Sequence, residues 1–101
     1  MTLHLLLRPE ARADLRDAYD WYQDQREGLG EEFLHEVRVV IDRILSTPTL
    51  YQQIRGEVRR ALPRRFPYGV FYLVEAERVV VLAVTHQARD PEVWRQRILE
   101  Q

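Results

Sequence analysis

Hydrophobic residues in the first half of the chain recur with helical spacing in two stretches. From Glu10 to Gln25, apolar positions stand three and four residues apart and charged side chains fill the opposite side. A second apolar stripe follows Gly30 and ends before Pro48. Pro9 suits the first turn of a helix, while Gly28 and Gly30 suit a helix cap and a tight turn. The pattern therefore predicts two amphipathic helices joined as a hairpin.

Strand patterns surround this predicted hairpin. A short apolar strand from Leu3 to Leu7 stops at the Arg8-Pro9 pair, because proline cannot continue a ladder of hydrogen bonds. Residues 79–84 are all apolar, which is typical of an interior strand that is covered on both faces. The elements predicted after Pro48 are strands from Val58 to Leu62, from Tyr68 to Glu75 and from Arg78 to Thr85, the last two paired as an antiparallel hairpin, and a final helix from Asp90-Pro91-Glu92 to Leu99.

Length and composition indicate one folded domain that spans residues 1–101. With 46% hydrophobic and 31% charged residues, the chain is too apolar and too evenly charged for a disordered tail. Cysteine is absent, and His4, His35 and His86 stand too far apart for a local pair of metal ligands, so we expect no metal site and no cofactor. No apolar run approaches the roughly 18 residues of a membrane span, and the N-terminus lacks the basic leader of a signal peptide. These features indicate a cytoplasmic protein without a membrane partner.

Charge is distributed unevenly beneath a net charge of −1. Residues 1–50 carry six arginines and ten acidic residues, whereas residues 51–101 carry nine arginines and six acidic residues. Lysine is absent, and the planar fork of arginine can pair with two oxygens of a phosphate or carboxylate at once. Five arginines gather in one segment that contains a single acid, Glu57, and they are Arg55, Arg59, Arg60, Arg64 and Arg65. This cluster is either a surface for a phosphate or an acidic partner, or a set of solvated surface charges.

The second half of the chain carries two motifs that are rarely met together. Residues 66–72 are Phe-Pro-Tyr-Gly-Val-Phe-Tyr, and residues 86–94 are His-Gln-Ala-Arg-Asp-Pro-Glu-Val-Trp. Together with Arg-Pro-Glu-Ala at residues 8–11 and with Pro48 after the second helix, these motifs make the chain resemble toxins of the RelE/ParE superfamily. Those toxins are the toxic halves of type II toxin-antitoxin pairs, and the resemblance covers essentially the whole chain.

The resemblance implies an α+β fold and a protein partner. In such a fold, a small antiparallel sheet carries the N-terminal helical hairpin on one face, in the order strand, helix, helix, strand, strand, strand, helix. The partner is a cognate antitoxin whose C-terminal segment wraps the toxin and neutralises it. Trp21 beside the buried stripe, and Leu29 and Leu50 in loops, could leave apolar area exposed for this antitoxin. The alternative for Trp21 is that its ring completes the edge of the core.

The superfamily divides into toxins that cut messenger RNA in the ribosome and toxins that bind and inhibit DNA gyrase. Cleavage by a 2′-hydroxyl needs a base, an acid and a charge stabiliser for the phosphate, and arginine can supply only the stabiliser. The arginines of residues 59–65 match the basic strand of the nucleases in character. However, the nucleases often use a tyrosine near the C-terminus, and here no tyrosine follows Tyr72. Gly69 also stands where many relatives carry a basic residue.

The sequence therefore favours a ParE-like toxin that acts by binding, with DNA gyrase as the target that the resemblance implies. One alternative is a ribosome-dependent mRNA endonuclease, with His86 as the catalytic base because it titrates near neutral pH. A histidine that ends a strand is, however, more often a hydrogen-bonded structural residue. Another alternative is a non-toxic module that binds an antitoxin or nucleic acid.

The resemblance also suggests which residues meet the target. We expect the side chains that contact the target or a phosphate to be Arg59, Arg60, Arg64, Arg65, Tyr68, Tyr72 and Arg89. Arg89 could instead pair with an acidic neighbour and fix the last helix. Trp94 is expected to be a core contact for that helix rather than a platform for stacked bases.

Overall fold

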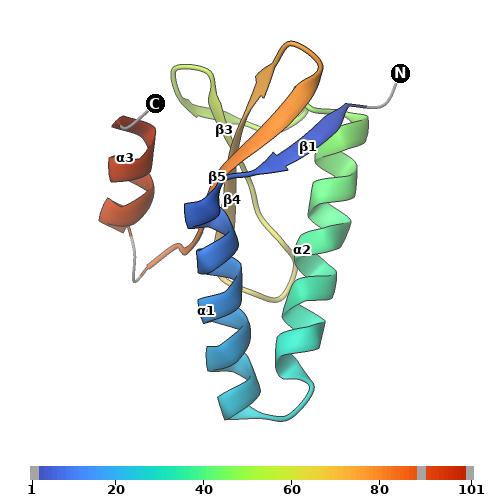
Figure 1. The fold of residues 1–101 in the computed structure, drawn as a ribbon, viewed down its shortest axis with the longest axis vertical. Coiled ribbons are helices and arrows are strands. Elements are labelled where there is room, and N and C mark those ends of the chain that lie inside the picture. The colour runs from blue at the N-terminus through green and yellow to red at the C-terminus, as the bar shows by residue number, and fades with distance from the viewer. Residues whose placement is uncertain (1–2, 89–90, 100–101) are drawn as a thin grey trace.

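A five-stranded sheet with helices on both faces forms the part of the chain that the computed structural model describes, residues 3–88 and 91–99 (Figure 1). Its elements are β1 (His4–Leu7), α1 (Pro9–Gln25), α2 (Leu29–Ser46), β2 (Gln53–Arg55), β3 (Val58–Ala61), β4 (Tyr68–Glu75), β5 (Arg78–His86) and α3 (Pro91–Leu99). The hairpin of α1 and α2 packs on one face of the sheet and α3 packs on the other. The predicted α+β class and the position of the hairpin are confirmed.

The strands lie side by side in the order β1-β5-β4-β3-β2. Strands β2 to β5 pair antiparallel with their neighbours, whereas β1 pairs parallel with β5, with Leu5 opposite Val79. A parallel pair needs a long crossover connection, and the chain between β1 and β5 includes the whole helical hairpin. The short strand β2 was not predicted, because the three residues of Gln53–Arg55 are too few to establish an alternating pattern.

Two glycines allow the helical hairpin to close tightly. Gly28 precedes α2 with a φ of +89°, a left-handed conformation that glycine adopts without strain. Gly30 lies inside the first turn of α2, where a Cβ would approach Cδ2 of Tyr19 and Cγ of Gln23 to 2.7 Å. The N–H of Gly30 donates to Oε1 of Gln23 at 2.7 Å. Gly30 therefore permits a close approach of α2 to α1, rather than forming the turn as its position suggested.

Aromatic side chains fill the core between the hairpin and the sheet. Tyr22 of α1 meets Phe66 edge-on at 4.9 Å between ring centroids, and Phe33 of α2 meets Tyr68 of β4 at 5.0 Å. Edge-on pairs of this kind add roughly 0.5–1.5 kcal/mol to the stabilisation from burial alone. The predicted apolar stripe of α2 faces this core, and its buried members are Phe33, Val37, Val40, Ile41 and Ile44.

A second, smaller core lies under α3. Val79 and Val81 of β5 belong to the core of the hairpin face, whereas Val80 belongs to the core of the α3 face. Trp94 of α3 stacks on Phe71 of β4 with 4.9 Å between ring centroids and 12° between the ring planes. The predictions that β5 is covered on both faces and that Trp94 is a core contact are therefore confirmed.

Candidate functional site

The arginines of residues 55–65 do not form one surface, because the structure directs them to different partners. Arg59 on β3 uses Nη1 for two backbone carbonyls, and it donates to O of Thr49 at 3.1 Å and to O of Tyr51 at 2.6 Å. These two bonds fasten the loop that leads from α2 to β2. The donors of Arg59 are thus engaged in holding the fold together.

Arg65 is also tied to the scaffold. Its Nη2 donates to Oε1 of Glu32 at 2.7 Å, while Nη2 of Arg26 donates to Oε2 of the same carboxylate at 2.9 Å. The hydrogen bonds from Arg65 and Arg26 hold the pKa of Glu32 below its usual range. By contrast, the side chains of Arg55 and Arg64 are exposed, and neither side chain forms a hydrogen bond or ion pair within residues 3–88 and 91–99. Among the described members of the expected target-binding set, Arg64 is therefore the one most available to an incoming partner.

Arg60 lies on the α3 side of the sheet, opposite Phe71 of β4. Its Nη1 donates to Oε1 of Gln87 at 3.1 Å. Gly69 makes room for this amide, because a Cβ at that position would collide with Nε2 of Gln87. The side chain of Gln87 thus occupies the space that a basic side chain at position 69 would need.

His86, the candidate base, faces the other side of the sheet. It stands opposite Tyr68 in the ladder between β4 and β5, and the two rings meet edge-on at 5.3 Å between centroids. Its Nδ1 accepts a hydrogen bond from the N–H of Ala88 at 3.1 Å. Residues that pair across a ladder project to the same face, and Tyr68 belongs to the core of the hairpin face. His86 and the Arg60–Gln87 pair therefore lie on opposite sides of the sheet.

The two tyrosines of β4 are core residues. Tyr68 and Tyr72 both face the hairpin and belong to its core. The hydroxyl of Tyr72 donates to O of Pro48 at 2.7 Å, and burial raises the pKa of Tyr72 to about 12 against the lowering effect of Arg59. Arg89, the remaining member of the expected target-binding set, lies outside the described residues.

The residues expected to meet an antitoxin do not share one surface. Trp21 projects from α1, is partly exposed, and lines a groove of about 380 Å³ at the open edge of β5. Leu29 is partly buried and packs against the hairpin core. Leu50 is exposed beyond the C-terminal end of α2, which the antiparallel hairpin places far from Trp21 (Figure 1). Their role in binding an antitoxin stays a prediction.

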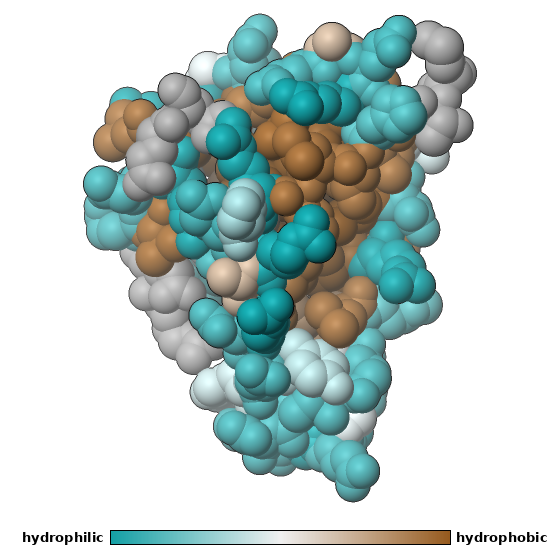
Figure 2. Space-filling view, viewed as in Figure 1, coloured by the Kyte–Doolittle hydropathy of each residue, from teal (hydrophilic) through white to brown (hydrophobic). Residues whose placement is uncertain are grey.

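An apolar groove that was not predicted from the sequence lies between β1 and α2. Its volume is about 350 Å³, and Figure 2 shows hydrophobic surface gathered beside β1 and the adjoining part of the helical hairpin. The signal was present in α2, where Leu34 and Leu45 stand beside the buried stripe. The apolar residues that line the groove are Leu5, Leu7, Leu15, Leu34, Val37, Ile41 and Leu45.

Two further findings concern ligands and membranes. Within the described ranges, no group of three or more His, Cys, Asp and Glu side chains is placed to hold a metal ion. No helix in the described part of the chain is long and apolar enough to cross a membrane.

Two solved structures share this fold. A structure described as the chromosomal ParDE TA system from P. aeruginosa aligns with a TM-score of 0.63 and 19% identity, over 83% of this chain and 95% of that chain. A mutant of the E. coli toxin RelE in the free state aligns with a TM-score of 0.71 and 18% identity, over 99% of this chain and 98% of that chain. At these identities, the likeness shows the fold alone. No curated protein sequence matches the chain significantly.

The family follows from the sequence match. The model of the ParE toxin of the type II toxin-antitoxin system, parDE, matches residues 5–91. This chain belongs to that family. The predicted membership of the RelE/ParE superfamily is thus confirmed, and the family implies a cognate antitoxin as its partner.

Proposed function

We propose that this chain inhibits bacterial growth by binding DNA gyrase and that it does not cleave messenger RNA. This proposal rests on the separation of His86, the candidate base, from Arg60, the candidate residue for binding a phosphate. His86 packs against Tyr68 on the hairpin side, whereas Arg60 bonds to Gln87 on the α3 side. A general base must lie within about 2.6–3.2 Å of the group that it deprotonates, or reach that group through one water molecule. A phosphate held by Arg60 would instead meet the amide of Gln87, which is no base at neutral pH.

The other groups that a nuclease would need are engaged in the fold. The phenol of Tyr72 is buried and bonded to a backbone carbonyl, and its pKa of about 12 keeps it protonated at neutral pH. Arg59 and Arg65 are bonded to the α2–β2 loop and to Glu32. Arginine stabilises negative charge but does not exchange protons near neutral pH. This arrangement supports a toxin that acts by binding.

Two exposed arginines offer separate contacts for an acidic partner. Arg64 follows β3, Arg55 lies at the tip of the β2–β3 hairpin, and both are exposed. Planar guanidinium groups at a protein surface pair well with carboxylates and also raise the association rate of an acidic partner. Gyrase is the target that the resemblance to ParE toxins implies.

Induced expression without antitoxin tests the proposal, with DNA, RNA and protein synthesis followed by pulse labelling in one culture. We expect DNA synthesis to fall first, with filamentation, and His86→Gln to remain toxic. The matched control is His35→Gln, which changes an exposed histidine of α2. An early collapse of protein synthesis that His86→Gln abolishes would overturn the proposal in favour of a ribosome-dependent endonuclease. Unaffected growth would favour the non-toxic binding module.

A further inference from the structure

Strand β1 has an open backbone edge. In its parallel ladder with β5, the N–H of His4 donates to O of Glu77 at 2.9 Å and the N–H of Arg8 donates to O of Val81 at 3.1 Å. Alternate residues of a parallel strand bond to the same neighbour, so the N–H groups of Leu5 and Leu7 point away from β5. Because β1 ends the strand order β1-β5-β4-β3-β2, no other strand of the described residues lies on that side.

The side chains of β1 do not protect this edge against pairing with another strand. Natural edge strands are commonly protected by charged residues, prolines or bulges. Here the strand is His-Leu-Leu-Leu, and Leu5 is 42% exposed and Leu6 is 39% exposed. An apolar edge with free backbone groups is a template for a strand from another chain. β1 therefore has the properties of a strand that is completed by a partner.

Helix α2 reaches beyond this edge of the sheet. Its outer stripe, Leu34 and Leu45, forms the apolar groove together with Leu5 and Leu7 of β1 and with the buried side chain of Ile41. Leu5 and Leu7 face the hairpin side, because they stand opposite residues of β5 that belong to the hairpin core. A strand added beside β1 would extend the sheet across the outer stripe of α2. Its alternate side chains would then fill the groove.

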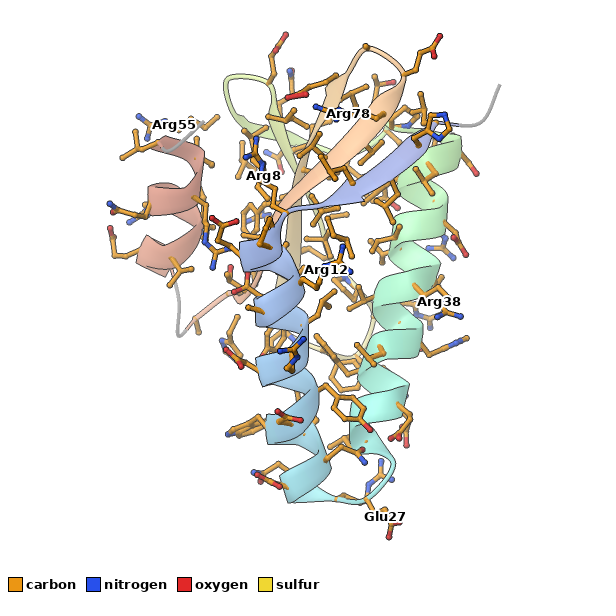
Figure 3. All side chains as sticks on the ribbon, viewed as in Figure 1. Arg8, Arg12, Glu27, Arg38, Arg55 and Arg78 are labelled. Atoms are coloured by element: carbon orange, nitrogen blue, oxygen red, sulfur yellow. The ribbon has the colours of Figure 1, made fainter. Side chains whose placement is uncertain are left out.

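One basic side chain lines the same groove, and a second lies on the same face of the molecule. Arg38 of α2 lines it, and Figure 3 shows Arg12 of α1 on the same face of the molecule. Both side chains are exposed, and neither forms an ion pair within the described part of the chain. Asp42 is the one acidic residue among the described residues that line the groove. The charge of this rim favours a segment whose apolar residues are flanked by carboxylates.

We propose that an extended segment of the cognate antitoxin adds to β1 as a further strand, with alternate apolar side chains in the groove and acidic residues beside Arg12 and Arg38. This inference rests on the proposed function as an antitoxin-controlled toxin. The occupant is the antitoxin because the family implies that partner. It is extended because a bound helix would cover the stripe of α2 but leave the N–H groups of Leu5 and Leu7 unpaired.

Amide hydrogen exchange tests the added strand directly. It is measured by NMR on the free chain and on the complex obtained by co-expression from the native toxin-antitoxin locus. We expect the amides of Leu5 and Leu7 to exchange rapidly in the free chain and at least ~100-fold more slowly in the complex. A complex that leaves both amides as fast as before would overturn the strand addition. A free chain that is dimeric by native mass spectrometry, with both amides already protected, would assign the edge to a second copy and overturn the choice of occupant.

A pair of leucine substitutions tests the groove. Leu34→Glu places a carboxylate in the groove, and Leu99→Glu makes the same change at another exposed helical leucine, on α3. We expect Leu34→Glu to weaken antitoxin binding about 10- to 100-fold, and Leu99→Glu to change it less than about twofold. Equal effects of the two substitutions would overturn the proposal.

Toxicity without antitoxin separates this inference from the proposed function. Leu34→Glu should still arrest growth, and co-expressed antitoxin should fail to rescue the cells. Loss of toxicity in a folded Leu34→Glu variant would assign the groove to the target and overturn the inference. If the unmodified chain is not toxic, the proposed function fails, while the exchange and binding results still decide where the antitoxin docks.

Discussion

Asp14 of α1 and Arg97 of α3 form a two-pronged ion pair that closes the open edge of β5. Nη1 and Nη2 of Arg97 donate to Oδ2 and Oδ1 of Asp14, each at 2.9 Å, and the side chains are 18% and 14% exposed. Oδ2 also accepts the N–H of Val84 at 3.0 Å, while Nη1 donates to O of Leu82 at 3.0 Å. β1 pairs with β5 only as far as Val81. Beyond that point, the side chains of Asp14 and Arg97 bond to the backbone of β5 where a neighbouring strand would otherwise do so.

Removal of the carboxylate should destabilise the fold. Asp14→Ala leaves the largely buried Arg97 without its counter-charge and the N–H of Val84 without an acceptor. We expect the free energy of unfolding in urea to fall by about 2–4 kcal/mol. The control is Asp17→Ala, an exposed acid of the same helix, for which a change within about 0.5 kcal/mol is expected. Equal losses in the two variants would show that the ion pair does not hold α3.

Gly30→Ala should lower the melting temperature, although the same change usually stabilises an exposed helix by roughly 1 kcal/mol. The new Cβ would approach the carbonyl O of Tyr19 to 2.8 Å and force the two helices apart. Thermal unfolding followed by circular dichroism measures the sign of the effect. A raised melting temperature would mean that the hairpin can relax without loss of packing.

The phenol of Tyr72 should make the protein lose stability at alkaline pH. Its pKa rises from 10.0 to about 12 on folding, so the folded state favours the neutral form. The resulting stabilisation is present below pH 10.0 and is lost as the pH rises toward about 12. Tyr72→Phe should reduce this alkaline loss, at a cost of about 1 kcal/mol at neutral pH from the missing bond to Pro48. The measurement is urea unfolding from about pH 8 to about pH 11, and equal slopes above pH 10.0 would contradict the assignment.

Arg64 and Arg59 should separate target binding from structural support. Arg64→Ala removes an exposed side chain, so we expect the free energy of unfolding to change by less than about 0.5 kcal/mol and inhibition of gyrase to weaken. Arg59→Ala removes a donor shared by two carbonyls, and we expect the free energy of unfolding to fall by about 1–3 kcal/mol. Unfolding in urea and inhibition of supercoiling are measured on both variants. Full inhibition by Arg64→Ala would exclude that side chain from the target surface.

The main elements of the fold could be predicted because their signals are local. The apolar stripes of α1 and α2 and the run of residues 79–84 each reflect the solvent exposure of one element, and the structure confirms them. The parallel pairing of β1 with β5 depends on how the hairpin packs, which no local pattern records. β2 forms because it pairs with β3, and its own three residues are too few to signal a strand.

The candidate site was harder to predict, because the partners of the arginines are distant in sequence. Arg60 bonds to a residue 27 positions away and Arg65 bonds to one 33 positions away. The arginine-rich segment showed that cations gather there, but not that their donors point to different elements. Likewise, nothing near His86 in the sequence reveals that β5 turns it away from the side of Arg60.

The most direct test of binding against cleavage uses one purified sample of the chain in two assays, supercoiling by DNA gyrase and cleavage of messenger RNA on translating ribosomes. Both assays are repeated with His86→Gln and, as a control, with the chain bound to its antitoxin. We predict that the chain and its His86→Gln variant stop supercoiling and leave messenger RNA intact, and that the antitoxin restores supercoiling. Ribosome-dependent cleavage of messenger RNA with supercoiling unaffected would contradict the account.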